Sequence, residues 1–305
     1  MVEYLNRVLH GDTRDLAERL PAASVDCIVT SPPYFGHRKY TGPSGDPREL
    51  GRQATVAEYV RDLTDCLNAV RRLLKPSGTM WLNLGDTYRN GQLLSIPWRT
   101  ALALQDDGWQ LRSDVIWHKP NAMPHSAKTR PTHDHEYLFM FSNTGDYFYD
   151  ADAIREPHVT FTEASRMRGG RNHLGKRGGT PEVGKNAGNS NLHDGRWDQA
   201  FHPKGRNKRT VWSVPLGTFR GAHFAVFPEK LIEPCISAGS PSGGVVLDPF
   251  MGAGTTGVVS ARLGRHFVGF DLSREYVDIA TRRIEESTGG QLRLSAASSS
   301  RRRGD

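Results

Sequence analysis

The chain has 305 residues, a hydrophobic share of 37% and a formal net charge of +7. This length allows one large α/β domain with an inserted module, and no apolar run is long enough to span a membrane. The N-terminus carries no signal-peptide pattern, and no Cys/His spacing of the zinc type occurs. We therefore expect no metal site and a cytoplasmic protein with reduced core thiols at Cys27, Cys66 and Cys235.

Strand and helix patterns alternate along most of the chain. Strands are expected at residues 6–10, 25–29, 79–84, 109–117, 137–141, 147–149, 245–248 and 266–271. Helices are expected at residues 15–20, 56–74, 96–105, 227–238, from 258 onward, and at 274–286. This alternation predicts a mostly parallel sheet with helices on both faces. The aromatic strands within 137–149 would form its antiparallel edge.

The most informative segment is Thr30-Ser31-Pro32-Pro33-Tyr34, which follows the apolar run 25–29. The carboxyl edge of a parallel sheet is where ligands bind in open α/β folds. The two prolines stiffen the turn and donate no backbone hydrogen bonds, so nearby carbonyls can accept from a ligand. Ser31 adds a hydroxyl and Tyr34 a flat ring. A planar ring with an exocyclic amine would fit such a site, although a plain proline turn has the same sequence.

A second segment predicts a nucleotide-type ligand. The strand 245–248 runs into a turn that contains Gly252 and Gly254, and glycine allows close backbone approach and positive φ. No Lys follows the second glycine, so the turn is not a P-loop. Asp271 ends the next strand about twenty residues later, the offset at which an acid accepts from ribose hydroxyls. An ordinary βαβ turn with a capping Asp is the alternative.

Together, Ser31-Pro32-Pro33-Tyr34 and Asp248-Pro249-Phe250-Met251-Gly252-Ala253-Gly254-Thr255-Thr256 resemble two motifs of a known family. That family is the S-adenosylmethionine-dependent DNA amino-methyltransferases of restriction–modification systems. The catalytic motif comes first here, as in the family's β group, a circular permutation of the Rossmann-like class I methyltransferase fold. Further segments at residues 74–86, 115–121, 135–138 and 221–228 also resemble the family.

The resemblance implies roles for individual residues. Ser31, Pro32, Pro33 and Tyr34 would be catalytic: the Ser31 oxygen and the Pro32 carbonyl would accept from the target amine, and Tyr34 would stack on the flipped base. Trp117 and Lys119 would face the target-base pocket or play a structural role. Asp12 would accept from the cofactor's adenine amine, or only cap a helix. The residues implied to bind S-adenosylmethionine are Asp12, Phe227, Pro228, Asp248, Pro249, Phe250, Gly252, Gly254, Thr255, Thr256 and Asp271.

Basic residues concentrate in the middle of the chain. From Arg155 to Thr210 there are twelve Lys and Arg against five Asp and Glu, a balance of +7 that equals the charge of the whole chain. Such a glycine-rich segment makes no core of its own. It is either a solvated loop or, as we favour, an insertion that neutralises phosphates of double-stranded DNA. The residues expected to contact DNA are Arg166, Arg168, Arg171, Lys176, Arg177, Lys204, Arg206, Lys208 and Arg209.

These predictions give a catalytic half at 1–154, the DNA target recognition insertion at 155–215, a cofactor-binding half at 216–287 and a disordered tail at 288–305. We expect methylation at cytosine N4, because in the resembled family Ser at position 31 goes mostly with cytosine and Asp with adenine. Adenine N6 is the alternative. RNA or protein methylation, or a non-catalytic DNA-binding protein, remain other interpretations, and the resemblance makes a homodimer plausible.

Overall fold

The computed structural model describes residues 1–36, 46–158, 202–217 and 227–290. The chain divides into two compact units. The first comprises Met1–Asp150 and Thr210–Asp305, and the second comprises Ala151–Arg209. The five predicted DNA contacts from Arg166 to Arg177 lie outside the described residues, as does the predicted tail beyond residue 290.

The first unit is built on an eight-stranded sheet with the order β1-β10-β9-β2-β3-β7-β6-β8. Its strands are β1 Arg7–His10, β2 Val25–Thr30, β3 Leu74–Leu84, β6 Gln110–His118, β7 His135–Ser142, β8 Val211–Ser213, β9 Val245–Asp248 and β10 His266–Asp271. A separate hairpin pairs β4 (Tyr88–Arg89) with β5 (Gln92–Leu93). Neighbouring strands are parallel except where β7 pairs with β3 and β6. The predicted mostly parallel α/β fold is therefore confirmed.

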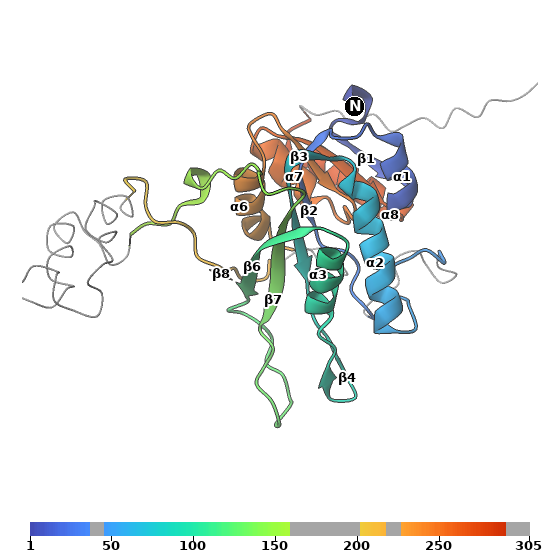
Figure 1. Cartoon of the computed structure of the whole chain (residues 1–305), viewed down its shortest axis with the longest axis vertical. Coiled ribbons are helices and arrows are strands. Elements are labelled where there is room, and N and C mark those ends of the chain that lie inside the picture. The colour runs from blue at the N-terminus through green and yellow to red at the C-terminus, as the bar shows by residue number, and fades with distance from the viewer. Residues whose placement is uncertain (37–45, 159–201, 218–226, 291–305) are drawn as a thin grey trace, which may run out of the picture. The chain divides into compact units, whose positions relative to one another are not determined.

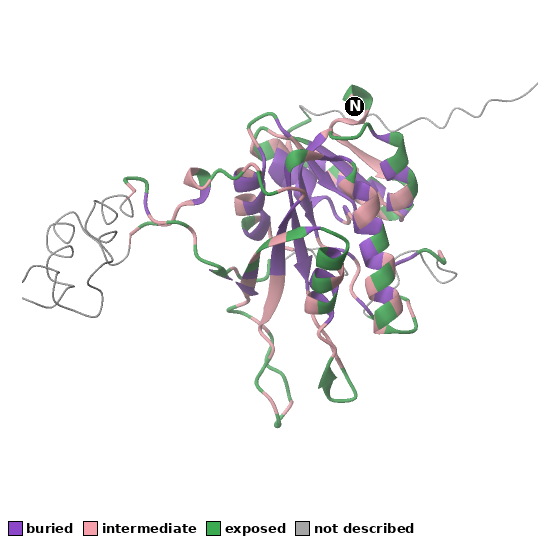
Figure 2. Ribbon diagram, in the orientation of Figure 1, coloured by how far each residue is buried: buried purple, intermediate pink, exposed green. Residues whose placement is uncertain are grey.

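Helices cover both faces of this sheet (Figure 1). On one face α1 (Thr13–Arg19), α2 (Val56–Arg71) and α3 (Ile96–Asp106) pack in sequence. On the other face α6 (Glu229–Gly239), α7 (Thr255–Arg262) and α8 (Arg274–Ser287) pack against one another and the sheet. Their apolar faces and the sheet form the buried layers in Figure 2. No helix in the described ranges is both long and apolar enough to cross a bilayer.

Two predictions about the antiparallel part of the sheet need correction. The antiparallel strand β7 lies inside the sheet, because β6 and β8 continue the sheet beyond it. Residues 147–149, predicted as a strand, are not one. Both sides of β7 are already paired, so no free edge remains there for a hairpin partner. The Phe148 N–H instead donates to the Ser77 carbonyl at 2.8 Å, and the Tyr147 ring packs under the Arg112 guanidinium at 4.8 Å.

The strand order creates a crevice for a ligand. Strands β2 and β9 are neighbours, and the chain leaves them in opposite directions, toward β3 from β2 and toward β10 from β9. Ligands of open α/β sheets bind at such a switch point, outside the carboxyl ends of the strands. The segments that begin at Ser31 and Pro249 follow these two carboxyl ends directly. The fold therefore brings the two sequence motifs together although they lie more than two hundred residues apart.

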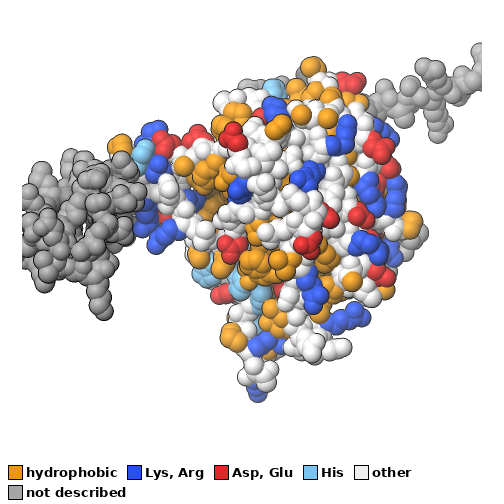
Figure 3. Space-filling model, in the orientation of Figure 1, with side chains coloured by type: hydrophobic (Ala, Val, Ile, Leu, Met, Phe, Trp, Pro, Cys, Tyr) orange, Lys and Arg blue, Asp and Glu red, His pale blue; other side chains and the backbone are white. Residues whose placement is uncertain are grey.

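The second unit is described at its two ends, residues 151–158 and 202–209. A short 3₁₀ helix spans Asp152–Ile154, and a single antiparallel bridge joins Glu156 to Arg206. On the face of the molecule in Figure 3, Lys and Arg side chains of the described parts are interspersed with Asp and Glu.

Candidate active site

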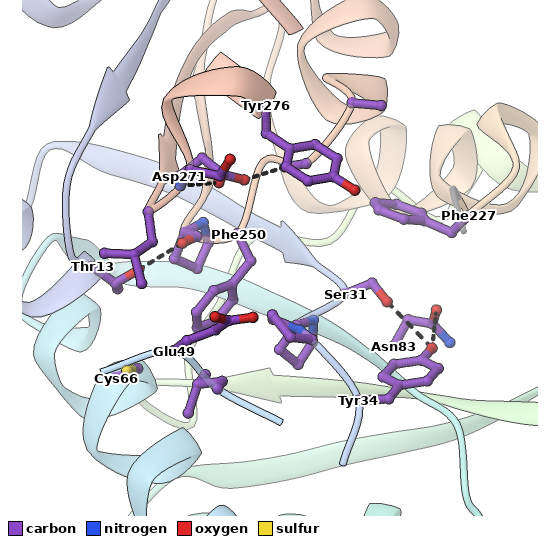
Figure 4. A pocket seen from close by; sticks show the side chains of 18 of the residues that line it. Thr13, Ser31, Tyr34, Glu49, Cys66, Asn83, Phe227, Phe250, Asp271 and Tyr276 are labelled. Carbon is purple, nitrogen blue, oxygen red and sulfur yellow. Dashed lines mark hydrogen bonds between the residues drawn. The ribbon is translucent and has the colours of Figure 1, made fainter. Parts of the chain in front are cut away.

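A cavity of about 380 Å³ opens at the carboxyl edge of the sheet (Figure 4). Its walls come from the segments after β1, β2, β9 and β10, with contributions from residues 48–50 and from β3, β6 and β7. The predicted site residues that line it are Asp12, Ser31, Pro32, Pro33, Tyr34, Trp117, Phe227, Pro249, Phe250, Gly252 and Asp271. The other residues predicted for the cofactor site or the target-base pocket, which are not among the lining residues, are Lys119, Pro228, Asp248, Gly254, Thr255 and Thr256.

Asp248 does not line the cavity, but its buried carboxylate holds residues around the cavity in place. One carboxylate oxygen accepts from the Thr30 hydroxyl at 2.6 Å and from the Phe250 N–H at 3.0 Å, and the other accepts from the Thr256 hydroxyl at 2.6 Å. Burial raises the pKa of this carboxyl to about 6, although the three hydrogen bonds act in the opposite direction. These buried hydrogen bonds thus connect the end of β2, the loop after β9 and the start of α7.

Asp271 both holds the glycine loop and faces the cavity. Its carboxylate accepts from the Gly252 N–H at 2.9 Å and from the Ser273 N–H at 2.8 Å. Burial raises its pKa to about 7, and the two backbone hydrogen bonds only partly offset this. Gly254 has a φ of +84°, and a Cβ there would lie 3.0 Å from the Ala280 Cα on α8. The loop therefore requires glycine for both its backbone conformation and its packing.

Of the two roles that the sequence left open for Asp12, the structure shows the helix cap, and the contact with the cofactor's adenine stays a prediction. Asp12 is the N-cap of α1 and accepts from the Arg14 N–H at 2.9 Å, and it also lines the cavity. Burial acts to raise the pKa of Asp12, but the paired Arg14 guanidinium and N–H outweigh it and leave the pKa lowered. The neighbouring Thr13 hydroxyl donates to the Pro249 carbonyl at 2.6 Å, which ties α1 to the loop after β9.

The Ser-Pro-Pro-Tyr turn is held by hydrogen bonds to other elements. The Ser31 hydroxyl donates to the Tyr34 hydroxyl at 3.3 Å, and the Tyr59 hydroxyl of α2 donates to the Pro33 carbonyl at 2.8 Å. The Tyr34 hydroxyl lies 2.7 Å from a Glu136 carboxylate oxygen and 3.2 Å from the Asn83 side-chain oxygen. Burial and the Glu136 charge raise the pKa of Tyr34 well above its usual range, so the phenol stays neutral.

Sequence reasoning did not assign Glu136 and Asn83 to the site, although both line the cavity. Lys119 lies behind Glu136: its ammonium forms an ion pair with that carboxylate and sits 4.7 Å from the Trp117 ring centre. Of the two predicted target-pocket residues, Trp117 lines the cavity and Lys119 supports a lining residue. The available signal was a carboxylate, Glu136, directly before the apolar and aromatic run 137–141 of β7.

The described basic residues of the second unit are paired with carboxylates. The Lys204 ammonium lies 3.2 Å from Asp152. A single carboxylate, Glu156, has three cations within 3.3–3.6 Å, which are Arg206, Lys208 and Arg209. Lys204 and Arg209 remain 66% and 69% exposed, so pairing leaves room for a polyanion. Among the residues that the structure describes, no cluster of three His, Cys, Asp or Glu could hold a metal ion.

The permuted Rossmann-like sheet, the glycine loop and the acid at the end of β10 together define a class I methyltransferase fold. The chain belongs to the N6/N4 DNA methylase family, whose model matches residues 25–282. It is 37% identical to the type II methyltransferase M.Cfr9I of Citrobacter freundii, over 95% of this chain and 91% of that one. It is 36% identical to M.SmaI of Serratia marcescens, over 91% and 90% of the two chains.

Solved structures show the same fold. A putative DNA modification methylase from Thermus thermophilus, in complex with S-adenosyl-L-methionine, has a TM-score of 0.60 and 25% identity over 93% of this chain and 95% of that one. The PvuII cytosine-N4-specific DNA methyltransferase has a TM-score of 0.65 at 21% identity, over 92% and 89%. The prediction of a DNA amino-methyltransferase of the restriction–modification type is confirmed for the family, without a distinction between cytosine N4 and adenine N6.

Proposed function

We propose that this chain transfers the methyl group of S-adenosylmethionine to N4 of a cytosine in duplex DNA. The observation that carries the proposal is the convergence, in one cavity, of the Ser31–Tyr34 turn with the glycine loop and Asp271. The first supplies acceptors for an exocyclic amine, and the second supplies the contacts expected around an adenosine.

The cavity residues fit the cofactor by their chemistry. Asp271, at the end of β10, would accept from the ribose hydroxyls, and Asp12, after β1, would accept from the adenine amine. The Phe250 ring lies on the cavity wall and would pack on the adenosine (Figure 4). When bound, the cofactor supplies an electrophilic methyl group. The glycine loop allows the backbone to approach the ligand closely.

The target amine needs activation, because its lone pair is delocalised into the base. Acceptance of its hydrogens by Ser31 and by the Pro32 carbonyl would pull the nitrogen toward a tetrahedral geometry and localise that lone pair. The base must leave the duplex to reach this cavity, where the Tyr34 ring can stack on it. Holding nitrogen and methyl in line then provides much of the acceleration.

Cytosine is preferred to adenine on the identity of residue 31. Both bases present an amine beside a ring nitrogen, so their edges offer the same donor and acceptor pair. In the resembled family, Ser at this position goes mostly with cytosine. The basic insertion of the second unit would contact phosphates of the duplex, and a homodimer stays a prediction from the resemblance.

An experiment with labelled cofactor tests the class of substrate. Tritium should pass from S-adenosylmethionine to duplex DNA and not to RNA or protein. Ser31→Ala should lower turnover by roughly 10²–10³, the scale for one preorganised polar contact at a reacting centre, with much less effect on cofactor binding. Label in RNA or protein alone would reject the proposal, and near-full activity of Ser31→Ala would reject the acceptor role.

A further inference from the structure

Two hydroxyl groups on the cavity wall, those of Ser31 and Tyr34, connect to the partly buried carboxylate of Glu136. The Ser31 hydroxyl contacts the Tyr34 hydroxyl at 3.3 Å, and the Tyr34 hydroxyl contacts Glu136 at 2.7 Å (Figure 4 shows the first of these contacts). An ionised carboxylate only accepts hydrogen bonds, and each hydroxyl has a single hydrogen. The Tyr34 hydrogen therefore points away from Ser31, and the Tyr34 oxygen can only accept from Ser31. The only Ser31 hydrogen then points toward the Tyr34 oxygen and is not offered to a ligand.

Asn83, the second side chain near the Tyr34 hydroxyl, also presents an acceptor to it. The Asn83 amide nitrogen donates to Glu136 at 3.1 Å and to the Tyr137 carbonyl at 3.1 Å. These two bonds fix the amide so that its oxygen faces the Tyr34 hydroxyl at 3.2 Å. Both polar neighbours of the Tyr34 hydroxyl on this side are thus acceptors.

The carboxylate itself is held from several directions. Lys119 pairs with the other Glu136 oxygen, and the Glu136 side chain is only 13% exposed. Gly85, just after β3, leaves no space for rearrangement: a Cβ there would lie 2.7 Å from the Tyr34 ring and 3.2 Å from a Glu136 oxygen. Little solvent screening and close packing make the direction of the hydroxyl chain well defined.

We propose that Glu136 is a positioning residue that makes Ser31 a hydrogen-bond acceptor for the target amine. This inference rests on the proposed function and deepens it. With the Ser31 hydrogen directed to Tyr34, the lone pairs of Ser31 remain to accept the hydrogens of an amine that enters the cavity. Glu136 does not touch the reacting atoms and acts through Tyr34.

The variant Glu136→Gln tests the direction of the hydrogen bonds from Ser31 through Tyr34 to Glu136, with little change in side-chain shape. A side-chain amide can donate to the Tyr34 oxygen, so the Tyr34 hydrogen becomes available to Ser31 and the chain can reverse. Ser31 would then present its own hydrogen to the amine. We expect the single-turnover methylation rate, at saturating cofactor and duplex DNA, to fall about 100-fold. The dissociation constants for cofactor and DNA, and the melting temperature, should change little.

Tyr34→Phe provides the second arm, because it keeps the ring and removes the middle hydroxyl. It should slow the same step by a similar factor. The double variant should lose no more than the slower single variant, since residues of one network are not additive. Glu233→Gln, an exposed carboxylate of α6 paired with Arg262, is the matched control and should keep the wild-type rate.

A wild-type rate in Glu136→Gln, or rate losses that multiply in the double variant, would overturn the inference while the proposed function stands. A loss explained entirely by weaker binding or by unfolding would overturn it too. A wild-type protein that methylates no duplex DNA would overturn the proposed function, and this inference with it.

Discussion

The N–H of Gly252 donates to the carboxylate of Asp271 across 2.9 Å. Through this bond the acid that ends β10 sets the position of the loop that follows β9. The same residue lines the cavity, so the side chain that sets the loop position is also placed where a ligand could contact it.

Asp271→Ala should therefore weaken S-adenosylmethionine binding by about 1.5–3 kcal/mol, the range for hydrogen bonds to a charged group. Titration calorimetry measures this, and circular dichroism should show that the fold survives. Asp278→Ala on α8, where the carboxylate is 58% exposed and paired with Arg274, is the matched control. Unchanged affinity in Asp271→Ala would remove this residue from the cofactor site.

Cofactor affinity should also depend on pH through Asp271. Burial raises the pKa of Asp271 from 3.8 to about 7. Its contribution to the free energy of unfolding is therefore fully present below its ordinary pKa and is lost as the pH rises through 7. Ribose hydroxyls would favour the ionised form, so cofactor binding should release a proton. The dissociation constant should rise about tenfold from about pH 8 to about pH 6. Asp271→Asn should remove this dependence; a wild-type slope in that variant would assign it to another group.

The buried contact between Thr256 and Asp248 predicts a stability effect. Thr256→Val keeps the shape of the side chain and removes a donor from a buried carboxylate. We expect a loss of about 1–3 kcal/mol in the free energy of unfolding, the penalty for an unsatisfied buried group. Urea denaturation measures it. Wild-type stability in Thr256→Val would mean that the hydrogen bonds from Thr30 and Phe250 are sufficient to satisfy the Asp248 carboxylate.

The basic end of the second unit should contribute to DNA affinity. Replacement of Lys204, Arg206, Lys208 and Arg209 by Ala should weaken DNA binding and flatten its salt dependence, by about 0.9 in the log–log slope for each lost phosphate contact. Cofactor affinity should not change. Fluorescence anisotropy at several salt concentrations measures the slope. A wild-type salt-dependence slope in this variant would mean that these cations form ion pairs with Asp152 and Glu156 and do not contact phosphates.

Glu156→Gln separates these two roles of the cations. The carboxylate competes with DNA for Arg206, Lys208 and Arg209, so its neutralisation should strengthen DNA binding and steepen the salt dependence. Weaker binding would show instead that Glu156 is needed to hold the cations in place.

The sequence predicted the parts of the site that a single segment encodes. Ser31 and Asp271 each lie at the end of a strand, so their place at the carboxyl edge follows from the order of the elements. Glu136 lies on β7, where it meets Tyr34 and Asn83 only through the register between β3 and β7. That register is set by tertiary pairing and has no local signature, so the sequence pattern assigns Glu136 no role.

The same reason explains the details that no local pattern predicts. Asp248 accepts hydrogen bonds within the glycine-loop motif, from Phe250 and Thr256, and also from Thr30 on another strand. Aromatic residues at 147–149 have strand propensity, but a strand also needs a free edge to pair with, and propensity does not report one. A count of charges in the insertion treats its cations as free, whereas Glu156 pairs with three of them.

The most direct test of the proposed reaction is nucleoside mass spectrometry of plasmid DNA methylated by the purified protein with S-adenosylmethionine. We predict N4-methylcytosine, absent when Ser31→Ala replaces the wild-type protein under the same conditions. N6-methyladenine as the only methylated nucleoside would contradict the assignment to cytosine, and no methylated nucleoside at all would contradict DNA methylation by this chain.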